Sequence, residues 1–464
     1  ADVAREMQIP KGDVLHQFRR DVETGKLPIV SWLVAPENFS DHPSAPWYGA
    51  WHVAEVMNIL THDPEVWKKT IFVLAYDEND GYFDHVPPFV APDPRNPETG
   101  KTSVGLDAAL DYWTLERDLA EQPEKEARGG PIGLGYRVPL VIASPWSRGG
   151  YVCSQVFDHT SVLQLLETVL SHKFGKPVRE TNISDWRRTV CGDLRTAFQT
   201  RREQRSGGLP FPSKDEFLES VYNAQFKRLP SGYKQLSKED RDAFERDRFA
   251  VGWMPQQEPG VRPSCALPYQ LYAGASLSAD GRSLELVLEA RTEVFGKESA
   301  GSPFHVYTPG SFRNRINLRT RAYAVLAGGR LTDLWELAGF ESGVYHLRVC
   351  GPNGFFREFT GSAADPQLEM QCEYARGGIE IQVTNRGPAC TVHIADEAYQ
   401  SGARSIDVAA GAKQSLVLQL QRSFGWYDIS AAVAGYETFG RRYAGRVETG
   451  ESGFSDPAMG RVKS

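Results

Sequence analysis

The chain has 464 residues, enough for about three domains of ordinary size. Its 52 Lys and Arg residues against 59 Asp and Glu residues give a formal net charge of −7, and 41% of its residues are hydrophobic. A general nucleic-acid-binding protein usually has a basic patch, and none stands out in this mildly acidic sequence. The composition is typical of a globular protein and not of a disordered one. No apolar run approaches the roughly 18 residues of a membrane-spanning helix.

The first 195 residues alternate strand patterns with helix patterns. Apolar runs at 28–34, 70–76 and 137–143 have the length of buried strands, and helical spacing of apolar side chains covers 46–62 and 160–170. Continuous apolar strands that alternate with helices predict an α/β domain whose sheet is mostly parallel and covered on both faces.

The composition becomes polar after about residue 196, with scattered Pro and Gly. We expect a linker or wrapping segment over 206–263, in which a helix begins after Ser237 because Asp240 suits its first turn. From residue 264 onward the apolar residues alternate, and the pair Gly377-Gly378 separates two alternating runs as in a β-hairpin.

The C-terminal part contains an internal repeat. The pattern of 343–361, which includes Arg357, is echoed in 425–445, where Arg442 and Tyr443 take the corresponding place. The repeat predicts two antiparallel β-sandwich domains in tandem, at 264–362 and 364–464.

Two of the six cysteines lie in the second predicted sandwich. Cys372 and Cys390 share the inward parity of their strands, so we expect buried thiols, with a disulfide between them as the alternative if the protein is exported.

Two acidic residues, Asp77 and Glu78, directly follow the predicted strand 70–76. In open parallel sheets, ligands bind beyond the carboxyl ends of the strands. Neighbouring carboxylates repel each other, and a divalent cation, which prefers oxygen ligands, would neutralise them. The alternative is a solvated acidic turn, because Asp, Asn and Gly are common in loops.

Three histidines lie on loops of the same predicted domain. His42 follows the predicted strand 28–34, and His85 and His159 come later in the chain. A histidine on such a loop can bind a phosphate or protonate a leaving group, and the alternative for His42 is an ordinary surface position. Dinucleotide, P-loop and α/β-hydrolase motifs are missing from the sequence.

Several segments of the chain carry a family resemblance: Ser-Trp-Leu-Val-Ala-Pro-Glu at 31–37, Ser-Asp-His-Pro at 40–43, Tyr-Asp-Glu-Asn-Asp-Gly at 76–81, Phe-Asp-His-Val at 83–86, and the stretches 137–150, 155–161 and 182–194. In these segments the sequence resembles bacterial phosphocholine-specific phospholipase C and the related acid phosphatases of the phosphoesterase family. The C-terminal repeat is similar to the duplicated C-terminal domain of that family.

The resemblance implies an alkaline-phosphatase-like catalytic domain, of which residues 1–205 form the C-terminal part. It implies metal-assisted hydrolysis of phosphatidylcholine or sphingomyelin to diacylglycerol or ceramide and phosphocholine. Asp77 and Glu78 would be ligands of a divalent metal ion, and His42 and His85 would be catalytic residues. An acid phosphatase of the same superfamily and a non-catalytic binding module are the alternatives.

In the family, a Glu-Asn metal-binding motif and the Ser or Thr nucleophile lie upstream of the matching region. Neither is identifiable in this chain, which opens at Ala1 without an export signal, so we expect an upstream portion and little turnover from the 464 residues alone.

A choline head group requires aromatic ring faces, because these attract quaternary ammonium ions. Trp47, Tyr48 and Tyr82 are the aromatic candidates for substrate binding, together with His159, although core packing is the alternative for the aromatic rings. The resemblance further implies a secreted or periplasmic monomer with a phospholipid substrate, no nucleic-acid partner and transient contact with a membrane surface. For the β domains themselves we favour a bracing role, since the sequence shows no basic cluster there.

Overall fold

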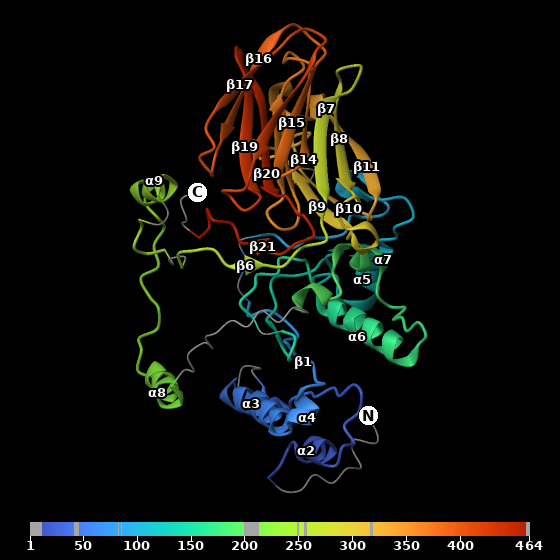
Figure 1. Ribbon diagram of the computed structural model, residues 1–464, viewed down its shortest axis with the longest axis vertical. Coiled ribbons are helices and arrows are strands. Elements are labelled where there is room, and N and C mark those ends of the chain that lie inside the picture. The colour runs from blue at the N-terminus through green and yellow to red at the C-terminus, as the bar shows by residue number, and fades with distance from the viewer. Residues whose placement is uncertain are drawn as a thin grey trace. The chain divides into compact units, whose positions relative to one another are not determined.

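The computed structural model describes residues 12–40, 46–81, 83–84, 86–147, 149–198, 213–247, 250–254, 258–315 and 319–460. They form two compact units (Figure 1). The first unit takes its described residues from 1–85, 136–149 and 198–200, and the second takes them from 86–135, 150–197 and 201–464.

The first unit is a small helical body with one strand pair. Its elements are α2 (His16–Glu23), η1 (Glu37–Phe39), α3 (Pro46–His62), α4 (Pro64–Trp67), β1 (Phe72–Ala75) and β5 (Leu140–Ala143). Phe18 and Val22 of α2 pack against Val56, Ile59 and Leu60 of α3. The apolar spacing that predicted a helix over 46–62 therefore marks the buried face of α3, and this prediction is confirmed.

The strand pair of this unit runs antiparallel. Phe72 lies opposite Ala143, and Ala75 lies opposite Leu140. The prediction of a mostly parallel sheet is therefore wrong for this pair, although both strands form where the apolar runs placed them. The predicted cover on both faces is not found for this pair either, because no residue of β1 or β5 is fully buried. An apolar run predicts a strand, but the direction and the cover of that strand depend on which neighbours it meets.

The predicted strand over 28–34 is not formed, so that prediction is wrong. The segment has neither helical nor strand pairing, and the exposed fractions of Trp32 and Val34 are 70% and 78%. A strand requires a hydrogen-bonding neighbour, and no described strand pairs with this segment.

The described part of the second unit contains helices and short strand pairs in addition to its β modules. The helices are α5 (Leu115–Glu121), α6 (His159–Phe174), α7 (Asp185–Val190), α8 (Lys214–Ala224) and α9 (Lys238–Arg246), with the 3-10 turns η2 (Pro97–Thr99), η3 (Ala109–Asp111), η4 (Arg195–Ala197), η5 (Gly296–Glu298), η7 (Leu337–Gly339) and η8 (Glu341–Gly343). The predicted helix after Ser237 is confirmed by α9. The Ser237 hydroxyl accepts a hydrogen bond from the Asp240 N–H at 3.1 Å, and the Asp240 carboxylate accepts one from the Ser237 N–H at 3.1 Å. Among the described residues, no helix has the length and apolar character needed to cross a membrane.

The strands of the second unit lie mostly in two β modules, and their pairs are antiparallel except that of β2 with β10 among the described residues (Figure 1). The strands of the first β module are β7 (Leu271–Leu277), β8 (Ser283–Ala290), β9 (Ser302–Tyr307), β10 (Thr320–Val325), β11 (Gly329–Glu336), β12 (Tyr345–Cys350) and β13 (Phe356–Gly361). Those of the second β module are β14 (Leu368–Ala375), β15 (Gly378–Asn385), β16 (Cys390–Asp396), β17 (Arg404–Val408), β18 (Lys413–Gln419), β19 (Trp426–Val433) and β20 (Tyr436–Arg446). The remaining strands are β2 (Gly100–Thr102), β3 (Tyr112–Trp113), β4 (Gly130–Pro131), β6 (Pro263–Ser264) and β21 (Gly453–Phe454).

One nine-stranded sheet runs through both β modules, in the order β17-β16-β19-β20-β13-β12-β9-β10-β2. Each module adds a three-stranded sheet of its own, β11-β8-β7 in the first and β14-β15-β18 in the second. The predicted antiparallel β-sandwich architecture is confirmed, and so is the hairpin at Gly377-Gly378, where Tyr374 of β14 pairs with Ile379 of β15. The two modules are joined edge to edge by the pairing of β13 with β20.

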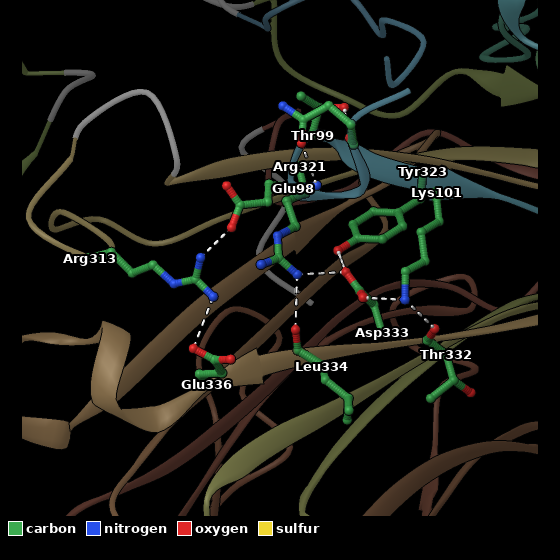
Figure 2. Close-up of polar contacts among 11 residues, drawn as sticks. Glu98, Thr99, Lys101, Arg313, Arg321, Tyr323, Thr332, Asp333, Leu334 and Glu336 are labelled. Carbon is green, nitrogen blue, oxygen red and sulfur yellow. Dashed lines mark hydrogen bonds and ion pairs between the residues drawn. The ribbon is translucent and has the colours of Figure 1, made fainter. Parts of the chain in front are cut away.

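Residues 97–102 dock on the outer strand of the first β module. β2 pairs in parallel with β10, placing Gly100 opposite Ala322. Figure 2 shows the polar contacts beside this pairing. The carboxylate of Asp333 pairs with the Lys101 ammonium at 2.6 Å and with Arg321 at 2.7 Å, and it accepts from the Tyr323 hydroxyl at 2.7 Å.

A further ion pair, from Arg313 of the first β module to Glu98, holds the segment 97–102. The guanidinium of Arg313 pairs with Glu98 and, at 2.9 Å, with Glu336 (Figure 2). These contacts bind residues upstream of the linker firmly to the first β module.

The cysteines of the second β module are thiols in this structure. Cys372 is buried in the shared core, whereas Cys390 at the start of β16 is half-buried. Burial raises the pKa of Cys372 to about 11, so this thiol is unreactive at neutral pH.

Candidate functional site

The predicted acidic pair lies on a loop that leaves the C-terminal end of β1, which we call the acidic loop (residues 77–81). Asp77 Oδ1 accepts from the Glu78 N–H at 3.1 Å, and Asn79 Oδ1 accepts from the Gly81 N–H at 2.7 Å. Gly81 has a φ of +83°, which a glycine adopts without strain. The turn is thus shaped by its own short side chains, and the carboxylates of Asp77 and Glu78 are exposed to solvent.

This arrangement fits the chemistry of a divalent cation only in part. Two adjacent exposed carboxylates offer the hard oxygen atoms that such a cation prefers, but a cation of this kind takes about six ligands. Among the residues that the structure describes, no three His, Cys, Asp or Glu side chains gather as a complete metal site. The acidic loop can therefore supply two ligands, and the others must come from elsewhere.

Three of the predicted site residues, His42, Tyr82 and His85, lie outside the described residues. Two others, Trp47 and Tyr48, begin helix α3, and their exposed fractions are 50% and 63%.

The aromatic candidates sit beside a residue that the sequence reasoning missed. The ring of Phe39, in the turn η1, lies edge-on to Tyr48 with the ring centroids 6.1 Å apart, and it also contacts Trp51 at 5.7 Å and His52 at 6.1 Å. The helical spacing of 48, 51 and 52 was a usable signal, because it places the three rings on adjacent positions of one helix surface. We call Phe39, Tyr48, Trp51 and His52 the aromatic cluster. The side chains of Tyr48 and Trp51 are exposed to solvent, so their rings can receive an apolar or cationic ligand.

His159 lies in the second unit, as the first residue of α6, and its side chain is exposed. The preceding residue, Asp158, is the N-cap of the helix, and it forms a capping box with Ser161. The backbone at His159 is therefore held by a strong helix start.

The half-buried guanidinium of Arg187 holds that helix start in place. Arg187 donates to Asp158 Oδ2 at 2.5 Å, to Asp111 Oδ1 at 2.7 Å and to the Gly133 carbonyl at 2.9 Å. The Ser184 hydroxyl donates to the second oxygen of Asp111. Because the two carboxylates are almost fully buried, Arg187 supplies the charge that makes their burial tolerable. Sequence spacing alone gave no sign of this cluster, whose members are far apart along the chain.

The turn after β5 lies away from the acidic loop. The Ser147 hydroxyl donates to the Ile142 carbonyl at 3.0 Å, and the hydroxyls of Ser144 and Ser147 are 2.9 Å apart. Because β1 and β5 are antiparallel, this turn follows Ala143 at one end of the pair, while the acidic loop follows Ala75 at the other. A parallel pairing would have brought both to the same edge.

Comparison with known proteins adds the following findings. Residues 1–171 match the model of the phosphoesterase family, and residues 263–362 and 366–446 match the model of the bacterial phospholipase C C-terminal domain. A non-hemolytic phospholipase C of Pseudomonas aeruginosa is 39% identical over 459 residues, which cover 96% of this chain and 60% of the relative. A hemolytic phospholipase C of the same organism is 36% identical over 465 residues, which cover 96% of this chain and 59% of the relative.

A shorter match covers the N-terminal part. Phospholipase C A of Mycobacterium tuberculosis is 41% identical over 182 residues, which cover 39% of this chain and 31% of the relative. The chain spans about 60% of the length of the two Pseudomonas relatives. The acidic loop, the aromatic cluster and His159 all fall within the phosphoesterase match.

Proposed function

The chain belongs to the bacterial phospholipase C group of the phosphoesterase family, and from that premise we propose that the whole protein is a phosphodiester hydrolase of the phospholipase C type. It would cleave phosphatidylcholine or sphingomyelin to diacylglycerol or ceramide and phosphocholine. The observation that carries the proposal is the acidic loop, where two adjacent carboxylates project into solvent directly after a strand of the phosphoesterase match.

We assign the acidic loop the role of a cation ligand. Asp77 and Glu78 would hold a divalent metal ion, which supplies charge stabilisation to the phosphoryl oxygens when bound. His42 and His85 are proposed to contact the phosphate and to assist proton transfer at the leaving oxygen.

Aromatic rings of the phosphoesterase match suit the choline end of the substrate. The exposed rings of Trp47 and Tyr48, with Tyr82, would attract a quaternary ammonium ion through their faces. His159, at the well-anchored start of α6, is proposed to contact the substrate from its exposed side chain.

Two other activities remain as alternatives within this proposal. An acid phosphatase would share the metal-assisted chemistry but act on small monoesters, and a binding module would hold the ligand without turnover. The phospholipase reading is favoured because the named relatives that match over nearly all of this chain are phospholipases C. We further propose a secreted or periplasmic monomer that touches the membrane surface only while it acts on lipid.

The experiment compares three substrates for the whole protein. Phosphocholine release is measured from phosphatidylcholine and from sphingomyelin in mixed micelles, and phosphate release is measured from p-nitrophenyl phosphate. We expect faster turnover of the phospholipids and loss of turnover on chelation with EDTA, restored by added divalent metal. Preference for the soluble monoester would favour the phosphatase, and absence of turnover on all three would favour the binding module.

A further inference from the structure

Two cysteines from distant parts of the chain lie side by side in the second unit. Val152 and Ser264 form a parallel β-bridge, in which the Val152 N–H donates to the Pro263 carbonyl at 2.8 Å and the Cys265 N–H donates to the Val152 carbonyl at 2.8 Å. In a parallel bridge, the residues that follow the bridged pair are also neighbours, and their side chains leave the strands on one face. Cys153 and Cys265 are those residues.

The Cys265 side chain is a hydrogen-bond partner of Cys153, in agreement with this placement on one face of the bridge. Cys153 also lies 3.4 Å from the hydroxyl of Thr196. The contact with Cys265, helped by the Thr196 hydroxyl and a backbone N–H at Gln155, lowers the pKa of Cys153 to about 6. Cys153 is half-buried and Cys265 is almost fully buried, so the two thiols differ in their access to solvent.

We propose that Cys153 and Cys265 are a redox pair that forms a disulfide. The bond would link the segment before α6 covalently to the residue that follows β6, just before the first β module in the chain. Disulfides require neighbouring Cα atoms and side chains on the same face, and the parallel bridge provides both. The bond would close a loop that contains α6, α7, α8 and α9 together with the linker. A cross-link over so long a loop restricts the unfolded chain strongly, so the oxidised form should be the more stable one.

The reaction needs an oxidant, which we take to be a low-molecular-weight or protein disulfide. The thiolate of Cys153 attacks one sulfur of that disulfide, forms a mixed disulfide and releases one thiolate. The Cys265 thiol then loses its proton, and its sulfur displaces the second thiolate from Cys153. Two protein thiols and one oxidant disulfide thus become one protein disulfide and two small thiols, with electrons and protons balanced.

Peptide mapping of the full chain tests the pair directly. The protein is incubated with oxidised glutathione, remaining thiols are blocked with N-ethylmaleimide, and the digest with trypsin is analysed by mass spectrometry. Because Arg262 precedes a proline, trypsin leaves Cys265 in the peptide 249–282, while Cys153 lies in the peptide 149–173. We expect these two peptides to be joined, with a mass two hydrogens below their sum, and to separate on reduction.

Two substitutions serve as controls. Cys265→Ser should abolish the joined species and leave Cys153 as a mixed disulfide with glutathione, whereas Cys350→Ser, at a half-buried cysteine of β12, should leave the link intact. Oxidation should also raise the unfolding temperature of the wild-type chain by several degrees, and Cys265→Ser should not show this rise. Blocked thiols at both positions after exhaustive oxidation, or a link from Cys153 to another cysteine, would overturn the proposal.

Discussion

Arg357 and Arg441 occupy equivalent places on the two strands that join the β modules. Arg357 donates to the Tyr427 hydroxyl at 2.9 Å and to the Ala444 carbonyl at 2.7 Å, and Arg441 donates to the Tyr345 hydroxyl at 2.9 Å and to the Thr360 carbonyl at 2.7 Å. Each guanidinium reaches from its own module to the other.

The symmetry extends to the surrounding rings and glycines. Each guanidinium lies over the phenylalanine two residues before it, Phe355 at 4.1 Å and Phe439 at 4.3 Å. Each tyrosine that accepts the hydrogen bond packs against a glycine of the adjacent strand, Gly361 or Gly445. The sequence repeat had suggested Arg442 as the counterpart of Arg357. The structure shows that the counterpart is Arg441.

This symmetry predicts matched effects of substitution. Arg357→Met and Arg441→Met each leave a buried hydroxyl and a carbonyl of the other module without their donor, so each should lower the free energy of unfolding by about 2 kcal/mol. Urea unfolding of both variants measures this. Arg422→Met, in the same module but away from the joining strands, is the control and should leave the free energy within about 0.5 kcal/mol of wild type. A large effect of only one of the two would contradict their equivalence.

The docking of β2 on β10 predicts a steric requirement for glycine. A Cβ atom at Gly100 would lie 1.7 Å from the Ala322 carbonyl oxygen, and the residue has a φ of +130°. Gly100→Ala should therefore break this pairing and lower the free energy of unfolding by about 3 kcal/mol or more. Gly105→Ala is the matched control, since Gly105 also has a positive φ of +85° but open space around its Cβ position, and it should cost about 1 kcal/mol. Equal losses in the two variants would argue against the close approach.

A buried histidine predicts a pH dependence of stability. His305 accepts from the Val90 N–H at 3.2 Å through Nε2, and burial lowers its pKa to about 4. As the pH falls from 6.5 towards 4, the unfolded chain binds a proton that the folded chain does not, so stability decreases by up to about 3 kcal/mol. His305→Gln keeps a hydrogen-bond acceptor and should remove this decrease in urea unfolding between pH 7 and pH 5. His393→Gln, at an exposed histidine of β16, should keep the wild-type pH dependence; a flat profile in the wild-type chain would refute the assignment.

The guanidinium of Arg187 predicts a stability effect at the start of α6. Arg187→Met leaves the buried carboxylates of Asp111 and Asp158 without their counter-charge and should cost about 3–5 kcal/mol. Hydrogen exchange should then rise in the first turn of α6, next to His159. Arg195→Met removes a guanidinium that is 55% exposed and should cost less than about 1 kcal/mol. Unchanged exchange at α6 in Arg187→Met would show that other contacts hold this helix start.

Local sequence patterns predicted individual elements well. The amphipathic spacing located α3 and α6, the Ser237 cap located α9, and the Gly377-Gly378 turn located the β14–β15 hairpin. Each of these signals is contained within a few neighbouring residues, so no knowledge of distant partners was required.

Long-range relationships could not be predicted in the same way. The direction of β5 relative to β1, the exposed state of 28–34 and the joining of β13 to β20 depend on which strands meet in space. The candidate site shows the same division. Asp77 and Glu78 could be proposed as candidates because they follow a strand. The Phe39 contacts and the Arg187 cluster join residues without a local signature.

The proposed function depends on binding of a divalent metal ion by the acidic loop. Its most direct test is phosphocholine release from phosphatidylcholine by Asp77→Asn of the whole protein, with Glu65→Gln, at an exposed carboxylate of α4 in the same unit, as the control. Loss of a metal ligand should lower turnover by about 100-fold or more and weaken the activation by added divalent metal, while the control stays at the wild-type rate. Wild-type turnover and wild-type metal activation in Asp77→Asn would contradict the account.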